Sequence, residues 1–228
     1  MRDGFTQQSV VHMTGAPARG LKRAGCARRA MLRGYGAQLE TLRPDHAPAL
    51  AEVVAGDTSM WRWMTAAPCD ERSMRAWVEA RRSMVADGRG WTFAICDTRQ
   101  LGGARLAGAT SLFDLDVAGR RAEVGHTWLA APWRGSGLNA VAKRLILGWA
   151  FDGVGLARVQ LMTDARNERS QRAMASIGAV REGLLRNYRF DKTGALRDSV
   201  VFSITAAEWP DVARRLDERA LVFSHTTP

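Results

Sequence analysis

A glycine-containing corner could bind an anion. Residues 132–139 read Pro-Trp-Arg-Gly-Ser-Gly-Leu-Asn, and apolar residues at helical spacing follow directly. Glycines let a backbone approach a ligand closely, and the first N–H groups of a helix lack intrahelical acceptors. Arg134 adds a positive charge. The spacing matches neither a P-loop nor a G-x-G-x-x-G loop, and a simple tight turn would also use glycine.

Two further segments carry polar side chains that suit acid–base chemistry. Glu123 and His126 lie in a run that predicts a strand before the glycine corner. Farther along the chain, Asn167 and Ser170 open a short helix that ends at Gly178, where Asn167 would suffice as a helix cap. Carboxylates and imidazoles accept protons and hydroxyls donate them, so these residues are candidates for catalysis.

Together these segments resemble the GNAT superfamily of N-acyltransferases. Residues 123–129 with 132–139 are similar to its acyl-CoA-binding motif, and residues 163–178 are similar to its second signature, Asn-x-x-Ser before a helix that ends in Gly. The Ala-Glu-Val-Gly strand entry and the Asn-x-x-Ser are closest to the RimJ/RimL-type subgroup. The resemblance covers about residues 38–205. In the family's Arg-x-x-Gly-x-Gly/Ala pattern, Asn139 replaces the last small residue.

The resemblance implies how acetyl-CoA, or another short acyl-CoA, is bound as co-substrate. Two parallel strands splay apart, and the pantetheine arm pairs with the free backbone of the strand that ends at Leu129. A backbone N–H near Leu129 polarises the thioester carbonyl, and the pyrophosphate lies on the amides of the glycine corner. The implied cofactor-binding residues are Thr127, Trp128, Leu129, Arg134, Gly135, Ser136, Gly137, Leu138, Asn139, Asn167 and Ser170.

The implied reaction is direct transfer of an acyl group, most often acetyl, to an amine. Because an amine is mostly protonated at neutral pH, a general base is expected. Glu123 stands where the family often has its base, although it could instead be a surface carboxylate that pairs with Arg120 or Arg121. His126 has a suitable intrinsic pKa, but it points away from the face of Glu123 unless a bulge intervenes, and it could be a core histidine.

The remaining catalytic candidates come from the second half of the chain. Ser170 occupies the position at which RimJ/RimL-like enzymes are thought to protonate the leaving thiolate, although it could be an ordinary first-turn serine. RimL-like enzymes have a proposed Glu base on the late hairpin, where this chain has Arg189. Asp198 is close by in sequence, as a base or as a structural anchor. The identity of the base stays open.

The acceptor pocket is expected near a tryptophan-rich connector. Trp61, Trp63 and Met64 lie where the family lines this pocket, and Tyr188 is a further candidate. Aromatic walls attract an ammonium group through cation–π interactions. Core packing is the alternative explanation for the connector. The acceptor itself is an amine, either a peptide or protein N-terminus, a lysine, or a small amine.

Hydrophobic periodicity and turn signals predict the fold class. The expected order β-α-α-β-β-β-α-β-α-β-β indicates a mixed α/β protein. The resemblance implies a three-layer arrangement, with a mostly antiparallel sheet of six to seven strands, a splayed parallel pair in its middle and helices on both faces. We expect a basic, disordered extension over residues 1–37, an acyltransferase domain over 38–210, and the end of a helix with a tail over 211–228.

Composition and charge limit the other functions. Of 33 Lys and Arg residues, residues 1–34 hold seven against one acidic residue, so the folded body is only mildly basic and nucleic-acid binding is not expected. No apolar stretch is long enough to span a membrane. Three distant cysteines and four scattered histidines give neither a disulfide framework nor a metal site, and a reducing cytoplasm is expected. A non-catalytic acyl-CoA sensor, a succinyl-CoA-dependent lysine acyltransferase and a homodimer all stay open.

Overall fold

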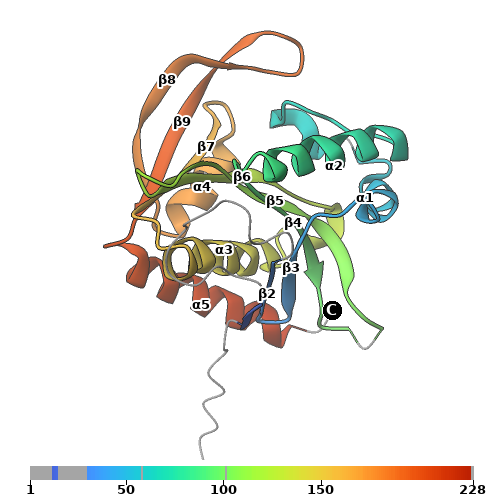
Figure 1. Cartoon of the computed structure of the whole chain (residues 1–228), viewed down its shortest axis with the longest axis horizontal. Helices are drawn as coiled ribbons and strands as arrows, with labels where there is room; N and C mark the ends of the chain where they lie inside the picture. The colour runs from blue at the N-terminus through green and yellow to red at the C-terminus, as the bar shows by residue number, and fades with distance from the viewer. Residues whose placement is uncertain (1–11, 15–29, 58, 101, 227–228) are drawn as a thin grey trace, which may run out of the picture.

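The chain folds around one mixed sheet (Figure 1). The computed structural model describes residues 12–14, 30–57, 59–100 and 102–226. The strands of the described part are β1 (His12–Thr14), β2 (Met31–Gly34), β3 (Ala37–Thr41), β4 (Gly90–Asp97), β5 (Arg105–Asp116), β6 (Arg121–Leu129), β7 (Arg158–Asp164), β8 (Val180–Phe190) and β9 (Leu196–Thr205). The helices are α1 (His46–Val54), α2 (Glu71–Ala86), α3 (Leu138–Gly148), α4 (Glu168–Ser176) and α5 (Trp209–His225).

Helices cover both faces of the sheet, as predicted (Figure 1). On one face, α1 and α2 enclose a tryptophan cluster in which Trp61 and Trp77 pack edge-on against Trp128 of β6. On the other face, α3 and α5 bury a larger core against the middle strands. The apolar stripe of α3 that the sequence predicts lies in this second core, where Leu145 has no exposed surface.

The middle of the sheet contains the splayed parallel pair. The strand order is β1-β2-β3-β4-β5-β6-β7-β9-β8, and only β6 and β7 run parallel. These two strands pair at Arg121, Ala122 and Glu123 alone. Beyond Glu123, β6 stays paired with β5 and β7 stays paired with β9, but β6 and β7 no longer pair with each other. The predicted wedge between two parallel strands is therefore present.

The ordered fold extends beyond the predicted domain at both ends. β2 pairs with β3, and Leu32 has no exposed surface, so at least residues 30–37 do not belong to a disordered extension. That prediction was wrong because a strand of four residues is too short to show a period. The described sheet has nine strands instead of six to seven for the same reason. At the other end, α5 runs past residue 210 and buries Leu216 and Phe223 completely. Residues 1–11 and 15–29 lie outside the described part.

Candidate active site

The unpaired edge of β6 offers backbone groups to a ligand. Trp128 is 4% and Leu129 8% exposed, and their side chains enter opposite cores. Successive residues of a strand turn their main-chain groups to alternate edges, so the groups of β6 that do not bond to β5 face the gap toward β7. Such groups need hydrogen-bond partners, and a pantetheine arm carries amides that can supply them. Thr127, Trp128 and Leu129 lie along this edge and fit such an arm, and their contacts with pantetheine stay a prediction.

The glycine corner leads from β6 into α3. Gly135 and Gly137 adopt φ values of +77° and +96°, which favour glycine, and Gly137 is the cap residue of α3. A Cβ at Gly137 would lie 3.2 Å from Cβ of Phe223, whereas nothing lies within 4 Å of a Cβ at Gly135. Within the described part, the amides of Gly135, Gly137 and Asn139 have no intramolecular acceptor. Together with the dipole of α3, they form a site suited to a pyrophosphate.

Two side chains of this corner are already engaged within the protein. The guanidinium of Arg134 forms an ion pair with Asp57 and donates to the carbonyl of Leu129 at 3.0 Å and to Oγ of Ser59 at 3.0 Å. Its charge is therefore balanced, and it braces the loop against the α1–α2 connector. Oγ of Ser136 donates to the carbonyl of Trp133 at 2.8 Å. The anion site consequently relies on backbone amides, with Leu138 buried beneath them.

Glu123 is a buried carboxylate that faces α2. It is 4% exposed, and its Oε2 accepts from Nη2 of Arg189 at 3.1 Å and from Nε2 of Gln160 at 3.4 Å. Burial raises the pKa of this carboxyl above its ordinary value, while the charge of Arg189 opposes the rise. The other oxygen, Oε1, lies beside Gly125, where a Cβ would come within 3.4 Å of it. Glu123 therefore has one anchored and one free oxygen.

The alternative partners of Glu123 are occupied elsewhere. Arg121 pairs with Asp116 at 3.0 Å, and Arg120 donates to the carbonyl of Gly155. The interpretation of Glu123 as a surface carboxylate paired with either arginine was therefore wrong. Its partner is Arg189, at the hairpin position where the resemblance implies a glutamate base. Glu123 and Arg189 are 66 positions apart, so no local pattern of the sequence indicates that they pair.

A β-bulge brings His126 onto the same side of the sheet as Glu123. The register between β5 and β6 shifts between Ala109 and Ser111, and His126 has a φ of +49°. The imidazole packs against the ring of Phe113 with centroids 4.6 Å apart. Burial, helped by the nearby charges of Arg81 and Arg189, lowers the pKa of His126 to about 3. The imidazole is therefore neutral at physiological pH and is a weak base.

A buried lysine that the sequence analysis missed contacts the predicted pantetheine strand. Lys143 of α3 is 8% exposed, and its Nζ donates to Oγ1 of Thr127 at 2.7 Å. Thr127 also forms a hydrogen bond of 2.8 Å with Thr110. Burial without a nearby carboxylate lowers the pKa of Lys143 to about 7. The apolar periodicity of α3 predicts core packing, so it did not indicate the contact between Lys143 and Thr127.

The start of α4 borders the gap from the side of β7. Oδ1 of Asn167 accepts from the amide of Ser170 at 3.2 Å, as a helix cap does, and Nδ2 of Asn167 donates to Oγ1 of Thr163 at 3.1 Å. The predicted capping role of Asn167 is confirmed. Ser170 is half-buried, and its hydroxyl has no hydrogen-bond partner among the described residues. This hydroxyl is free to serve as a donor.

Asp198 holds a bulge in β8. Its Oδ1 accepts from the amide of Asn187 at 2.8 Å, at the point where Asn187 adopts a φ of +51°. Of the two roles that the sequence left open, this contact favours the structural anchor. Tyr188 follows the bulge and is 47% exposed, with the guanidinium of Arg189 5.4 Å from its ring. Tyr188 therefore lies at the surface beside the Glu123–Arg189 pair.

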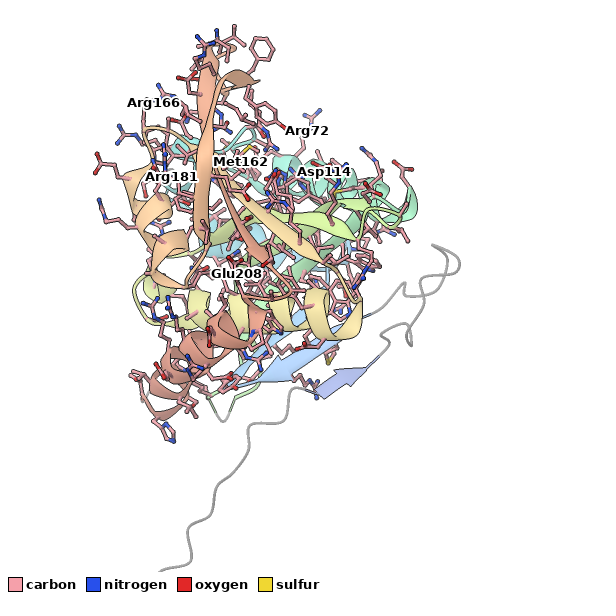
Figure 2. All side chains as sticks on the ribbon, turned by 90° about the vertical axis from the view of Figure 1, so that its left-hand side faces the viewer. Arg72, Asp114, Met162, Arg166, Arg181 and Glu208 are labelled. Carbon is pink, nitrogen blue, oxygen red and sulfur yellow. The ribbon has the colours of Figure 1, made fainter. Side chains whose placement is uncertain are left out.

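The tryptophan-rich connector divides between core and surface. Trp61 is only 1% exposed and packs 5.2 Å from Trp128, so core packing accounts for it and it does not line an open pocket. Met64 is half-buried against the same cluster. Trp63 lies between the guanidinium groups of Arg62 at 4.7 Å and Arg166 at 5.3 Å. Arg166 and Arg72 both lie on the side of the sheet away from α5 (Figure 2).

The described part of the chain offers no group of three or more His, Cys, Asp or Glu residues that could hold a metal ion. Every helix in that part is too short or too polar to cross a bilayer.

Comparison with curated proteins gives two relatives from Bacillus subtilis (strain 168). YdaF, whose name describes it provisionally as a ribosomal N-acetyltransferase, is 34% identical over 104 residues, which cover 46% of this chain and 56% of YdaF. YoaA, named an uncharacterized N-acetyltransferase, is 29% identical over 114 residues, which cover 50% of this chain and 60% of YoaA. The chain thus spans little more than half the length of these curated relatives.

Solved structures share the whole fold. A structure from T. thermophilus, provisionally named an acetyltransferase, is 37% identical, with a TM-score of 0.73 over 83% of this chain and 96% of that one. Mycobacterium smegmatis RimJ in complex with CoA-disulfide is 27% identical, with a TM-score of 0.67 over 80% of this chain and 88% of that one. A model of the acetyltransferase (GNAT) domain matches residues 38–180. The chain therefore belongs to the GNAT acetyltransferase family, and its relatives support the RimJ/RimL-like subgroup.

Proposed function

We propose that this protein is an acyl-CoA-dependent N-acyltransferase that transfers an acetyl group to a primary amine by direct attack. The observation that carries the proposal is the unpaired edge of β6 between two features. One is the unpartnered amides of the glycine corner, and the other is the buried carboxylate of Glu123. The first suits the diphosphate of CoA, and the second suits a proton acceptor beside the thioester.

The donor would be held mainly by backbone groups. Thr127, Trp128 and Leu129 pair with the pantetheine arm, while the free amides within residues 134–139, those of Gly135, Gly137 and Asn139, hold the pyrophosphate. When bound, the coenzyme supplies the activated acyl thioester. Lys143 steadies this strand through Thr127. Asn167 closes the other side of the gap at the start of α4.

Glu123 is the proposed general base. An amine acceptor with an ordinary pKa arrives as an ammonium ion and must lose a proton before it attacks. Oε1 of Glu123 is free to take that proton, because Arg189 and Gln160 bind Oε2. These two residues position the carboxylate. His126 contributes a neutral wall, since its low pKa makes it a poor proton acceptor.

Ser170 is the proposed donor to the leaving thiolate. Its hydroxyl is free and lies at the N-terminal turn of α4, where the helix dipole favours a developing negative charge. A thiol has an ordinary pKa near 8.5, so the thiolate is a tolerable leaving group even without full proton transfer. Loss of Ser170 should therefore reduce turnover less than loss of Glu123.

The acceptor in this proposal is a protein or peptide N-terminal α-amino group, or a small amine. The name of YdaF, which refers to ribosomal N-acetylation, favours the first class for this chain. The exposed Tyr188 and Arg166 and the half-buried Trp63 form the entrance of the proposed site.

The test is release of free thiol from acetyl-CoA in a screen of peptides and small amines. Glu123→Gln should lower kcat by about a hundredfold or more while leaving the Kd for CoA unchanged. Asp114→Asn is the matched control, because Asp114 is a nearby carboxylate that makes no contact with an acceptor in the proposal. Binding of acetyl-CoA without thiol release from any amine would instead identify a sensor. Failure to bind CoA would reject the site.

A further inference from the structure

Three buried donors without acceptors cluster on the α2 side of β6. They are the indole N–H groups of Trp77 and Trp128 and the Nε–H of Arg81. Trp77 is 6% exposed and Trp128 is 4% exposed. The two indole rings pack edge-on at 6.0 Å, and the guanidinium of Arg81 lies 5.5 Å from the ring of Trp77. We call these three residues the donor cluster.

Among the residues that the structure describes, no carboxylate pairs with this cluster. Arg81 takes part in none of the ion pairs of the described residues, and its neighbour Arg82 uses the carboxylate of Glu79. Burial alone lowers the pKa of Arg81, with no opposing carboxylate. Arg81 is partly buried, and a buried Nε–H without an acceptor is costly in a folded protein, so an acceptor that arrives from outside would relieve it.

The cluster lies next to the proposed reaction site. Trp128 directly follows Thr127 on the strand that binds the pantetheine arm, and Arg81 is close enough to His126 to depress its protonation. Glu123 and Arg189 lie on the same side of the sheet, and their charges balance each other. Arg81 is therefore a cation beside this site that pairs with no carboxylate of the described residues.

We infer that the donor cluster is a binding subsite for a carboxylate carried by one of the substrates. A carboxylate only accepts hydrogen bonds, an indole only donates them, and a guanidinium donates in a fork that matches two carboxylate oxygens. The carboxylate belongs either to the acyl chain of the donor or to the acceptor amine. This inference rests on the proposed function, because it assigns the substrate class of the same site.

Binding measurements with matched ligands separate the two sources. For the donor, calorimetry compares succinyl-CoA with butyryl-CoA, which has the same chain length without the carboxylate. For the acceptor, it compares peptides with Glu or Gln at the second position, added to protein saturated with CoA. In the wild type, the carboxylate member of one pair should bind about 10- to 100-fold more tightly.

Variants then assign the preference to the cluster. Arg81→Met should bring the ratio of the two affinities within that ligand pair close to one, because it weakens binding of only the ligand that carries the carboxylate. Trp77→Phe keeps an aromatic ring and removes the N–H. Arg81→Lys keeps the charge and removes the fork, so each variant should lower the affinity ratio in part. Arg82→Met is the matched control, because Arg82 is the next residue on α2 and pairs at the surface. It should leave the ratio unchanged.

The inference is overturned if neither ligand pair is distinguished by the wild type. It is also overturned if all three cluster variants keep the wild-type ratio. Both experiments measure affinities, so they show whether the donor cluster binds a carboxylate even if no amine is acylated. Absence of thiol release with every donor and acceptor would then reject the proposed function alone.

Discussion

Nη2 of Arg189 donates to Oε2 of Glu123 across 3.1 Å, and this contact joins the β8–β9 hairpin to the middle of the sheet. The hairpin therefore influences the charge state of this buried carboxylate, the proposed general base. Without the arginine, a carboxyl group that is 4% exposed would hold its proton to a higher pH.

Arg189→Met is expected to move the acid limb of the kcat/KM profile upward by about one pH unit or more. The base works only when it is ionised, and the variant removes the cation that favours ionisation. At alkaline pH the variant should recover much of the wild-type rate. The measurement is kcat/KM across the acid and neutral range, with Arg186→Met, an exposed arginine on the same strand, as control. An unmoved acid limb would show that Glu123 is not the base.

His126→Phe is expected to flatten the dependence of stability on acid pH. The pKa of His126 falls from an ordinary 6.5 to about 3 on folding, so between these values only the unfolded chain binds the proton. Wild-type stability should therefore be lost as pH falls through this window, by up to about 1.4 kcal/mol per pH unit for this group. Urea unfolding of both proteins through the window measures the difference, and identical slopes would contradict the burial of the imidazole.

Lys143→Met is expected to remove a rise in stability above neutral pH. The pKa of Lys143 falls from 10.5 to about 7, so between these values the unfolded chain binds a proton that the folded chain has lost. Wild-type stability should therefore increase with pH across this window relative to the variant, by up to about 1.4 kcal/mol per pH unit. Lys192→Met, at an exposed position, should follow the wild type. Parallel profiles for wild type and Lys143→Met would be the contrary result.

Gly135→Asp and Gly135→Asn form a pair that tests the anion site. Both side chains tolerate the positive φ of +77° at this position better than most, and a Cβ there meets nothing within 4 Å. The two variants have the same shape and differ in one negative charge. Repulsion of the pyrophosphate should make the Asp variant bind CoA about tenfold or more weakly than the Asn variant. Equal Kd values by calorimetry would place the diphosphate elsewhere.

The sequence predicted the framework of the site because its signals are local. The glycine corner, the stripe of α3 and the Asn167 cap each follow from residues within one or two turns of each other. The splayed pair came from the family resemblance, and the pairing that stops at Glu123 bears it out.

The partners of the charged residues could not be predicted, because they are set by contacts distant in sequence. Arg134 is neutralised by Asp57, and Glu123 is held by Arg189. The direction of the His126 side chain could not be predicted either. A β-bulge places it on the side of Glu123, and the alternation of residues along a strand does not reveal a bulge. Trp61 looked like a pocket wall only because aromatic residues serve cores and binding sites equally well.

The region that matches the family model ends at residue 180, yet the candidate active site also depends on residues downstream of it. Residues 196–205 form β9, the antiparallel neighbour of β7, and Arg189 comes from the strand before it. Phe223, near the end of α5, supports the turn at Gly137. A fragment trimmed to the matched region would keep every signature motif, but it would lose β9, the strand that pairs with β7, and Arg189, the counter-ion of Glu123.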